Sequence, residues 1–287
     1  MNKNVLITGT SSGLGFETAI LMAEKGYQVY ASMRNLEKAD KLIQIAKEKK
    51  LSIEVLELDV SQMHTIELAV KSIIEKDGKI DVLVNNAGAG FAKTLEQASL
   101  DEVDWVTDVN YTGVIRTTKA VLPYMRKVKA GRIINITSVG GLVGQPFNEL
   151  YCGAKFAVEG FTEALASYVT DAFNIHFSCV EPGGIETEFM RSAVGKSTND
   201  QGEFNQGEYS DIFNRYLSGA QSRASEESAS NYQTGKEVAE VILSVVNAEQ
   251  PPLRIRTSAW AENFCQLKTQ ADPDGLKLIA AVKSAIL

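Results

Sequence analysis

The chain has 287 residues, 44% hydrophobic and 23% charged, and its 29 Lys and Arg against 36 Asp and Glu give a formal net charge of −7. This length allows one large α/β domain or two smaller ones with a substantial core, and the composition is that of a globular protein. An acidic chain with scattered Lys and Arg lacks the electrostatic footprint of a nucleic-acid-binding protein, so we expect no nucleic-acid partner.

Cysteine usage and the N-terminus indicate the compartment. Cys152, Cys179 and Cys265 are an odd number without a C-x-x-C pair, which predicts buried apolar thiols in a reducing compartment rather than a disulfide framework. The N-terminus has no charged region followed by a long apolar stretch, and no segment reaches transmembrane length. We therefore expect a cytoplasmic protein without membrane contact.

Short apolar or β-branched runs without polar alternation predict strands covered on both faces. They lie at 5–8, 28–32, 53–58, 82–85, 132–137 and 175–180. Segments with helical periodicity alternate with them, at 16–25, 36–49, 65–76, 100–128 and 152–172. This alternation predicts an α/β fold of the doubly wound, Rossmann type, with a mostly parallel sheet, helices on both faces and ligands beyond the carboxyl ends of the strands.

The last third of the chain differs in amino-acid composition. Residues 191–232 are rich in Ser, Gly, Asn, Gln and Glu, and we interpret them as a mobile lid over a substrate site. A helix at 235–247 and a strand near 252–257 would complete a seven-stranded sheet. We therefore expect one catalytic domain over residues 1–258, followed by a tail, 259–287, whose role the pattern does not indicate.

A glycine-rich segment, T-G-T-S-S-G-L-G from Thr8 to Gly15, joins the first predicted strand to the first helix. Glycines at such a place let the chain turn sharply and let the backbone approach a pyrophosphate, and the helix N-terminus offers free N–H groups and a positive dipole end. The spacing G-x-x-x-G-x-G differs from the common G-x-G-x-x-G fingerprint. The alternative is that these glycines only form a loop.

Tyr151 and Lys155 are four residues apart on a predicted helix and so share one face. A free Tyr titrates near pH ~10, and a fixed cation nearby favours the phenolate, which suits general acid–base catalysis. Ser138 could polarise a carbonyl or alcohol at the same place. Taken alone, however, Tyr-x-x-x-Lys is ordinary helix-surface composition.

Several further motifs stand in a fixed order along the chain with these two. Together they are Thr8 to Gly15, Asp59, Asn85-Asn86-Ala87-Gly88, Asn110, Ser138, Tyr151 with Lys155, and Pro182-Gly183-Gly184-Ile185-Glu186-Thr187. In order and spacing they resemble the short-chain dehydrogenase/reductase family over residues 3–190 and, more loosely, to about 257. The stretch from Ser138 to Ala157 resembles the branch of the 17β-hydroxysteroid and retinol dehydrogenases.

The resemblance implies a catalytic set. Tyr151 would be the general acid or base, and Lys155 would lower its pKa and hold the nicotinamide ribose. Ser138 would bind the reacting oxygen, and Asn110 would sit in a helix kink and hold a water that links Lys155 to solvent.

The resemblance also implies a nicotinamide dinucleotide site. The cofactor contacts it predicts are Gly9, Ser11, Ser12, Gly13, Leu14, Gly15, Arg34, Asp59, Val60, Asn86, Ala87, Gly88, Tyr151, Lys155, Pro182, Gly183, Ile185 and Thr187. For Asp59 alone, a helix N-cap is an equally good interpretation.

The choice of dinucleotide rests on Arg34. An NAD site usually places an acidic residue about 20 positions past the glycines, whereas the sequence here is Ala31-Ser32-Met33-Arg34-Asn35. Arg34 offers a planar fork that suits a 2′-phosphate, so we predict NADP(H) over NAD(H). Against this, Ser12 stands where many NADP-using relatives carry a second basic residue.

These inferences predict an NADP(H)-dependent oxidoreductase, a carbonyl reductase or alcohol dehydrogenase, that acts on a small-molecule carbonyl or secondary alcohol as a homodimer or homotetramer. The alternatives are an NAD(H)-dependent alcohol dehydrogenase of the same family, a sugar-nucleotide epimerase, and a non-catalytic dinucleotide sensor. His64 and His176 are too far apart in sequence to suggest a metal site. Steroid, retinoid, fatty and aromatic carbonyls all fit the apolar substrate region expected from 140–148, Phe189, Met190 and the predicted lid.

Overall fold

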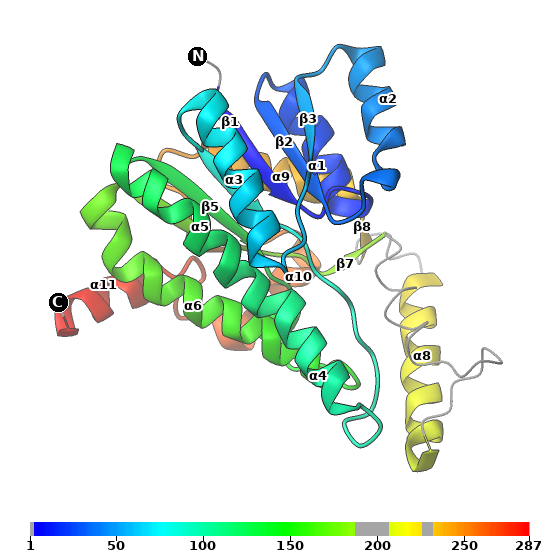
Figure 1. The fold of residues 1–287 in the computed structure, drawn as a ribbon. Helices are drawn as coiled ribbons and strands as arrows, with labels where there is room; N and C mark the ends of the chain where they lie inside the picture. Colours follow the sequence, from blue (N-terminus) through cyan, green and yellow to red (C-terminus); the bar gives the residue numbers. More distant parts are fainter. Residues whose placement is uncertain (1–2, 187–206, 226–231, 287) are drawn as a thin grey trace.

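The structure is a computed structural model that describes residues 3–186, 207–225 and 232–286. Seven strands form one sheet in the order β3-β2-β1-β4-β5-β6-β9 (Figure 1). Their bounds are β1 (Asn4–Thr8), β2 (Gln28–Met33), β3 (Ile53–Glu57), β4 (Val82–Asn85), β5 (Gly131–Ile136), β6 (Ile175–Glu181) and β9 (Arg254–Arg256). Each neighbouring pair is parallel, which confirms the predicted doubly wound sheet.

Helices cover both faces of this sheet (Figure 1). One face packs against α1 (Gly13–Glu24), α2 (Asp40–Lys49) and α9 (Gly235–Asn247), and the other against α3 (Met63–Asp77), α5 (Gly113–Val128) and α6 (Glu149–Phe173). Successive β1 side chains point to opposite faces, as strand geometry requires. Val5 and Ile7 therefore join one core cluster, and Leu6 joins the other.

The strand order places a crevice above β1. The chain runs from β1 outward to β2 and β3 and then crosses back to β4, which pairs with the other edge of β1. The connections that follow β1 and β4 therefore diverge at the carboxyl end of the sheet, where α/β folds of this order bind ligands. Both the glycine-rich segment and the 85–88 motif begin there.

The long helix predicted at 100–128 is interrupted. It consists of α4 (Leu100–Thr107), a π-helical turn η2 (Asp108–Thr112) and α5. The predicted helix at 36–49 likewise divides into a 3-10 turn (Leu36–Lys38) and α2. A π-turn inserts extra backbone into a helix and often marks a functional site, and here it contains Asn110. Asn110 therefore lies at an irregular turn inside this long helix, at the position where the family resemblance predicts a kink.

The predicted tail is helical. It forms α10 (Ala259–Thr269) and α11 (Leu276–Ile286), and α11 lies along α6, where Lys283 Nζ is 2.6 Å from Asp171 Oδ2 (Figure 1). Ala261 and Cys265 of α10 are buried against the segment that follows β5. The tail is thus continuous with the packing around the predicted site.

Part of the predicted lid lies outside the described residues, namely 191–206 and 226–231, as do Phe189 and Met190. Its described part contains a 3-10 turn (Gly207–Tyr209) and α8 (Ser210–Ser225). A short strand β8 (Tyr232–Gln233) pairs with β7 (Gly184–Ile185). Within the described ranges, no helix combines the length and the apolar character that crossing a bilayer requires.

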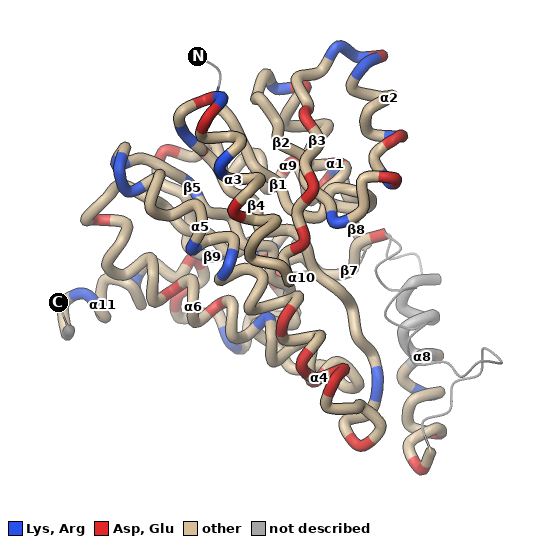
Figure 2. The backbone as a smooth tube through the Cα atoms, in the orientation of Figure 1, with Lys and Arg blue, Asp and Glu red and all other residues tan. Residues whose placement is uncertain are grey.

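Charged side chains are distributed over many elements. Figure 2 shows Lys and Arg spread along the described chain and Asp and Glu gathered on α4, near the end of the helix pair it forms with α6. α4 begins with a capping box, in which the Ser99 hydroxyl accepts from the Glu102 N–H and the Glu102 carboxylate accepts from the Ser99 N–H. These acids lie at the positive end of the helix dipole, where they stabilise the helix.

Candidate active site

The turn after β1 requires its glycines. Gly9 and Gly13 have φ angles of +72° and +59°, in the left-handed region that favours glycine. A Cβ on Gly9 would lie 2.8 Å from Ala87 Cα, and one on Gly15 would lie 2.3 Å from Asn86 Nδ2. The turn therefore packs directly on the segment after β4, and the interpretation of these glycines as a simple loop does not account for this contact.

Hydrogen bonds hold the two segments together. Asn86 Nδ2 donates to the carbonyls of Thr8 (2.9 Å) and Gly9 (3.0 Å), and the Thr8 hydroxyl accepts from the N–H groups of Asn86 (3.0 Å) and Ala87 (2.9 Å). We expected Asn86 among the cofactor contacts. Its side-chain donors are instead directed to the turn, so the amide shapes the cradle.

The start of α1 offers an anion site. Ser12 is the N-cap residue, but its side chain makes no capping hydrogen bond, and the first N–H groups of a helix have no partner within the helix. Such a terminus attracts phosphate through its N–H groups and its dipole. Leu14 was predicted to contact the cofactor, but its side chain is buried in the core, so only its backbone is available to a ligand. The cradle fits the pyrophosphate of a dinucleotide.

Arg34 directly follows β2 at the edge of this cradle. Its side chain is exposed and makes no ion pair with any described residue. The Thr10 N–H and hydroxyl both donate to the Ser32 carbonyl, at 3.0 and 3.1 Å, so the end of β2 is tied to the glycine turn. Arg34 is thus available to a phosphate bound next to the turn.

Asp59 and Val60 follow β3. Asp59 Oδ1 accepts from the N–H (2.9 Å) and hydroxyl (2.7 Å) of Ser61, which is a local turn rather than the N-cap of α3, because α3 begins later, at Met63. Val60 is buried, and its carbonyl accepts from Arg116 Nη1 at 3.2 Å. Neither side chain is bonded to the glycine turn.

The predicted catalytic side chains come together where β5 meets α6. Tyr151 and Lys155 lie on the first turns of α6, with the Lys155 Nζ 5.6 Å from the centroid of the Tyr151 ring. Lys155 is 5% exposed and donates to the Ile136 carbonyl at 2.9 Å. Ser138 follows Ile136 by two residues. Its hydroxyl accepts from the Gly140 N–H at 3.0 Å and lies against the Tyr151 phenol.

The pKa of Tyr151 differs from expectation. Burial raises this pKa above its usual value of 10, the Ser138 hydroxyl lowers it, and Cys152 adds a smaller rise. Desolvation thus dominates, and the Lys155 ammonium donates to the Ile136 carbonyl. A lowering of the Tyr151 pKa by Lys155 stays a prediction. Burial also lowers the pKa of Lys155 to about 8. At neutral pH the phenol is therefore protonated and can donate.

Asn110 is fully buried and binds the loop after β4. Its Oδ1 accepts from the Ala89 N–H at 3.0 Å, and its Nδ2 donates to the carbonyls of Ala89 (2.9 Å) and Val106 (3.0 Å). A Cβ on Gly88 would lie 3.0 Å from Asn110 Oδ1 and 3.6 Å from Lys155 Nζ. Asn110, Gly88 and Lys155 thus lie close together, while the predicted water link from Lys155 to solvent stays a prediction.

The Pro182–Thr187 segment adjoins Ser138. The Pro182 carbonyl accepts from the Val139 N–H at 2.9 Å and from the Ser138 hydroxyl at 3.5 Å. Ile185 belongs to β7 and pairs with Gln233. Thr187 lies outside the described residues, so its predicted contact with the carboxamide stays a prediction.

Two side chains at this site were not predicted. Trp260 of α10 covers Gly183, whose added Cβ would lie 2.9 Å from Trp260 Cζ3, and it stacks on Phe264 at 5.0 Å between centroids. No pattern in the tail indicates this contact. Glu159 is buried one helical turn beyond Lys155, and the same four-residue spacing that selected Tyr151 with Lys155 could have found it.

The two histidines and Tyr111 lie outside the catalytic set. His176 Nε2 lies 3.2 Å from Asn174 Oδ1, and Tyr111 packs edge-on against Phe161 at 6.4 Å. His64 is exposed near the start of α3. Within the described ranges, no cluster of three or more His, Cys, Asp and Glu side chains could hold a metal ion.

Known proteins are similar to this chain in sequence and in fold. The short chain dehydrogenase family model matches residues 3–197. The 17-beta-hydroxysteroid dehydrogenase type 1 of Mus musculus is 37% identical over 284 residues, which are 97% of this chain and 80% of that protein. Retinol dehydrogenase 8 of Bos taurus is 39% identical over 279 residues, 95% of this chain and 86% of that protein. A variant of actinorhodin polyketide ketoreductase, crystallised with NADPH, superposes with a TM-score of 0.75 at 28% identity and covers 91% of this chain and 98% of that chain.

Proposed function

Because the chain belongs to the short-chain dehydrogenase/reductase family of oxidoreductases, we propose that it is an NADP(H)-dependent enzyme that interconverts a carbonyl and a secondary alcohol. The family and its hydroxysteroid and retinol dehydrogenase branch, both predicted from sequence, are confirmed by these matches. The observation that carries the proposal is the meeting of Tyr151, Ser138 and Lys155 beside the glycine turn and its free helix N-terminus.

The bound dinucleotide would supply the hydride. The carbonyl oxygen would accept hydrogen bonds from the Tyr151 and Ser138 hydroxyls, and the Tyr151 proton would pass to that oxygen as negative charge develops on it. Lys155 would stabilise the phenolate that remains and hold the ribose. Asn110 would keep the loop at Gly88 in place against Lys155.

Carbonyl reduction is the direction we propose. The raised pKa of Tyr151 keeps its phenol protonated at neutral pH, which suits a group that donates a proton. Alcohol oxidation would require the phenolate, which burial disfavours.

The NADP(H) preference rests on Arg34. No carboxylate stands at the end of β2 to repel a 2′-phosphate, and the exposed guanidinium is available beside the turn. The ketoreductase that superposes on this chain was crystallised with NADPH, which supports the proposal.

The substrate would be an apolar carbonyl compound. Buried Val139 and Leu142 follow Ser138, and Phe147 packs against Phe213 and Tyr216 of α8, at 4.9 and 5.4 Å between ring centroids. This aromatic contact joins the Ser138–Tyr151 segment to α8, the described helix of the predicted lid, which we propose covers the substrate. The names of two relatives point to steroids and retinol, and fatty and aromatic carbonyls fit the same surface.

Oligomerisation through α4, α5 and α6 forms part of the proposal. These helices expose large apolar side chains, with Leu100 81% and Tyr168 52% exposed. Burying them between two copies would remove apolar surface from water. We expect a homodimer or homotetramer by light scattering.

The cofactor proposal is tested by kinetics with NADPH and NADH. We expect kcat/KM to favour NADPH, and Arg34→Ala to lower it roughly 10–100-fold with NADPH alone, the effect of losing a charged hydrogen bond of about 1.5–3 kcal/mol. Arg126→Ala, which removes an exposed arginine from α5, is the matched control. A preference for NADH in the unaltered protein would refute this assignment.

The activity is tested on a panel of ketones and aldehydes of increasing size, by following NADPH oxidation. Tyr151→Phe should remove turnover while NADPH still binds, since only the hydroxyl is lost. Tight NADPH binding without turnover of any carbonyl would favour the alternative of a dinucleotide sensor.

A further inference from the structure

A buried carboxyl group continues the catalytic face of α6. Tyr151, Lys155 and Glu159 are spaced at four-residue intervals, so they lie one above another along the helix. Glu159 is 6% exposed, and a carboxyl group is rarely so buried without a strong partner. Its Oε1 has no hydrogen-bond partner in the structure.

Glu159 lies under the turn that carries Ser138. A Cβ on Gly141 would be 3.2 Å from Glu159 Cγ and 3.3 Å from its Oε1. The ionisable and polar side chains that act on this carboxyl come from four other places in the fold: Thr137 after β5, Cys179 of β6, Arg254 of β9 and Glu163 on the next turn of α6.

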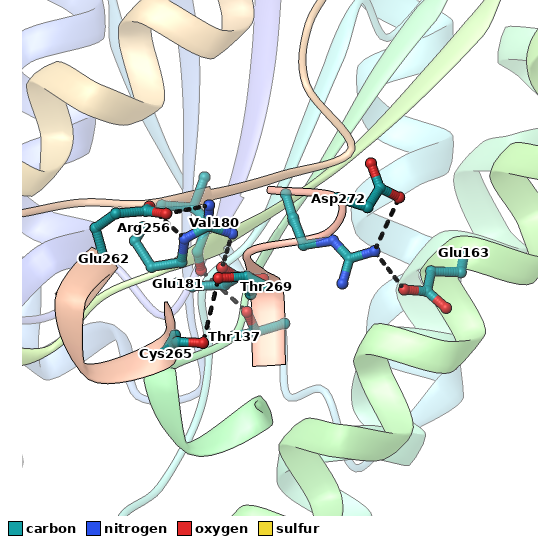
Figure 3. A network of polar contacts seen from close by, with 10 residues as sticks. Thr137, Glu163, Val180, Glu181, Arg256, Glu262, Cys265, Thr269 and Asp272 are labelled. Carbon is teal, nitrogen blue, oxygen red and sulfur yellow. Dashed lines mark hydrogen bonds and ion pairs between the residues drawn. The ribbon is translucent and has the colours of Figure 1, made fainter. Parts of the chain in front are cut away.

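A second buried carboxyl, Glu181 of β6, lies in the same network. Its side chain has no exposed surface, and its Oε2 is 3.2 Å from Arg256 Nη1. Figure 3 shows Arg256 between Glu181 and Glu262 of α10, whose carboxylate accepts from Arg256 Nε at 2.7 Å and Nη2 at 3.1 Å. Arg256 therefore divides its charge between two acids, and Glu181 Oε1 has no partner.

Arg254 is also shared between acids. It lies 3.2 Å from Glu163 Oε1 and 4.0 Å from Asp272 Oδ2, two carboxylates that Figure 3 shows on the same side of the network. Neither arginine is thus a dedicated partner of Glu159.

Burial raises the pKa of both buried carboxyl groups. Repulsion from Glu159 raises that of Glu181 further, against the opposing effect of Arg256, whereas Thr137, Cys179 and Arg254 oppose the rise at Glu159. Two nearby buried carboxylates cannot both ionise cheaply. The hydrogen bonds and the Arg254 charge around Glu159 therefore favour its ionised form.

The negative charge of Glu159 acts on the Lys155 ammonium. Burial lowers the pKa of Lys155 to about 8, and the largest opposing influence is the Glu159 carboxylate, followed by Cys179. The Lys155 ammonium donates a hydrogen bond to the Ile136 carbonyl, which is a neutral acceptor.

We propose that Glu159 is a positioning residue whose buried carboxylate keeps Lys155 in its charged form behind Tyr151. Thr137, Cys179 and Arg254 assist by favouring the ionised form of Glu159. The consequence for catalysis rests on the function proposed above, in which Lys155 must be cationic, whereas the effect on the ionisation of Lys155 does not.

The direct test measures the ionisation of Lys155 by NMR. In protein labelled with ¹³C and ¹⁵N at lysine, the Lys155 side-chain signal is assigned by its loss in Lys155→Met, and its midpoint is followed with pH. Glu159→Gln has nearly the same shape and no charge, so we expect the midpoint to fall by at least half a pH unit. An unchanged or higher midpoint in folded Glu159→Gln would overturn the proposal.

Control variants separate charge from packing. Glu163→Gln removes a carboxylate from the same helix, beside Arg254, and should leave the midpoint unchanged or slightly higher. Gly141→Ala disturbs the packing on Glu159 without changing charge and should not lower the midpoint; a fall equal to that of Glu159→Gln would assign the effect to packing. If Glu159→Gln does not fold, Glu159→Asp replaces it in the test. Its side chain is one methylene shorter, so the carboxylate moves away and the Lys155 midpoint should fall, by less than half a pH unit.

The catalytic readout is the pH profile of kcat/KM for carbonyl reduction. We expect the alkaline limb to move to lower pH in Glu159→Gln, so that activity falls more at pH 8 than at pH 6.5. An equal loss at every pH would indicate a structural role and overturn the proposed one. An unaltered protein without hydride transfer would refute the proposed function alone, because the NMR midpoint would still report on Glu159.

Discussion

Asn110→Leu tests whether the π-turn supports the site. The substitution keeps the approximate size of a side chain with no exposed surface and removes its three hydrogen bonds, two to Ala89 and one to Val106. At about 1 kcal/mol for each bond, the loss is about 3 kcal/mol. For a chain of this size that corresponds to a fall in Tm of about 6 °C.

The same change should loosen the loop at Gly88, which lies between Asn110 and Lys155. We therefore expect kcat/KM for NADPH-dependent reduction to fall at least tenfold at a temperature where the variant is folded. Thermal denaturation followed by circular dichroism gives the Tm, and initial rates give kcat/KM. Asn263→Leu, at an exposed position on α10, is the control. A Tm within 1 °C of the unaltered protein, together with unchanged kinetics, would refute the supporting role.

Further predictions concern the cradle, the tail and stability. Gly15→Ala should abolish NADPH binding in fluorescence titration because its Cβ would overlap the turn, whereas Gly144→Ala, which has open space around it, should bind normally. Trp260→Ala removes the ring that covers the segment after β6 and should raise the Kd for NADPH about fivefold, comparable to a lost ring contact of about 1 kcal/mol; an unchanged Kd would assign the ring to stability only. Burial lowers the pKa of His176, so protonation opposes folding and Tm should fall as pH decreases below about 6.5. His176→Gln should reduce that fall and exposed His64→Gln should not; equal pH dependence in both variants would contradict the assignment.

Elements with strong local signals were predicted well. The seven strands and the helix at 235–247 agree with the structure to within a few residues, because buried parallel strands have an uninterrupted apolar pattern that no distant contact is needed to reveal. The π-turn inside 100–128 left no such pattern. It depends on Asn110 bonding a loop that is distant in sequence.

The roles of single side chains were harder to predict. Asn86 was expected at the cofactor, and that contact stays a prediction; the sequence did not reveal that its side-chain amide bonds the glycine turn, because only the fold brings these two segments together. The tail was not predicted to reach the site, because Trp260 contacts Gly183 through packing between elements that are distant in sequence.

The sequence by itself determined the fold class, the glycine cradle and the common helix face of Tyr151 and Lys155. These properties are local: a positive φ angle, an apolar run and a four-residue spacing depend on neighbouring residues. Only the tertiary structure decided how readily the Tyr151 and Lys155 side chains ionise. The pKa values of Tyr151 and Lys155 depend on desolvation and on charges such as Glu159, whose own ionisation is set by strands and helices that meet it only in the folded protein.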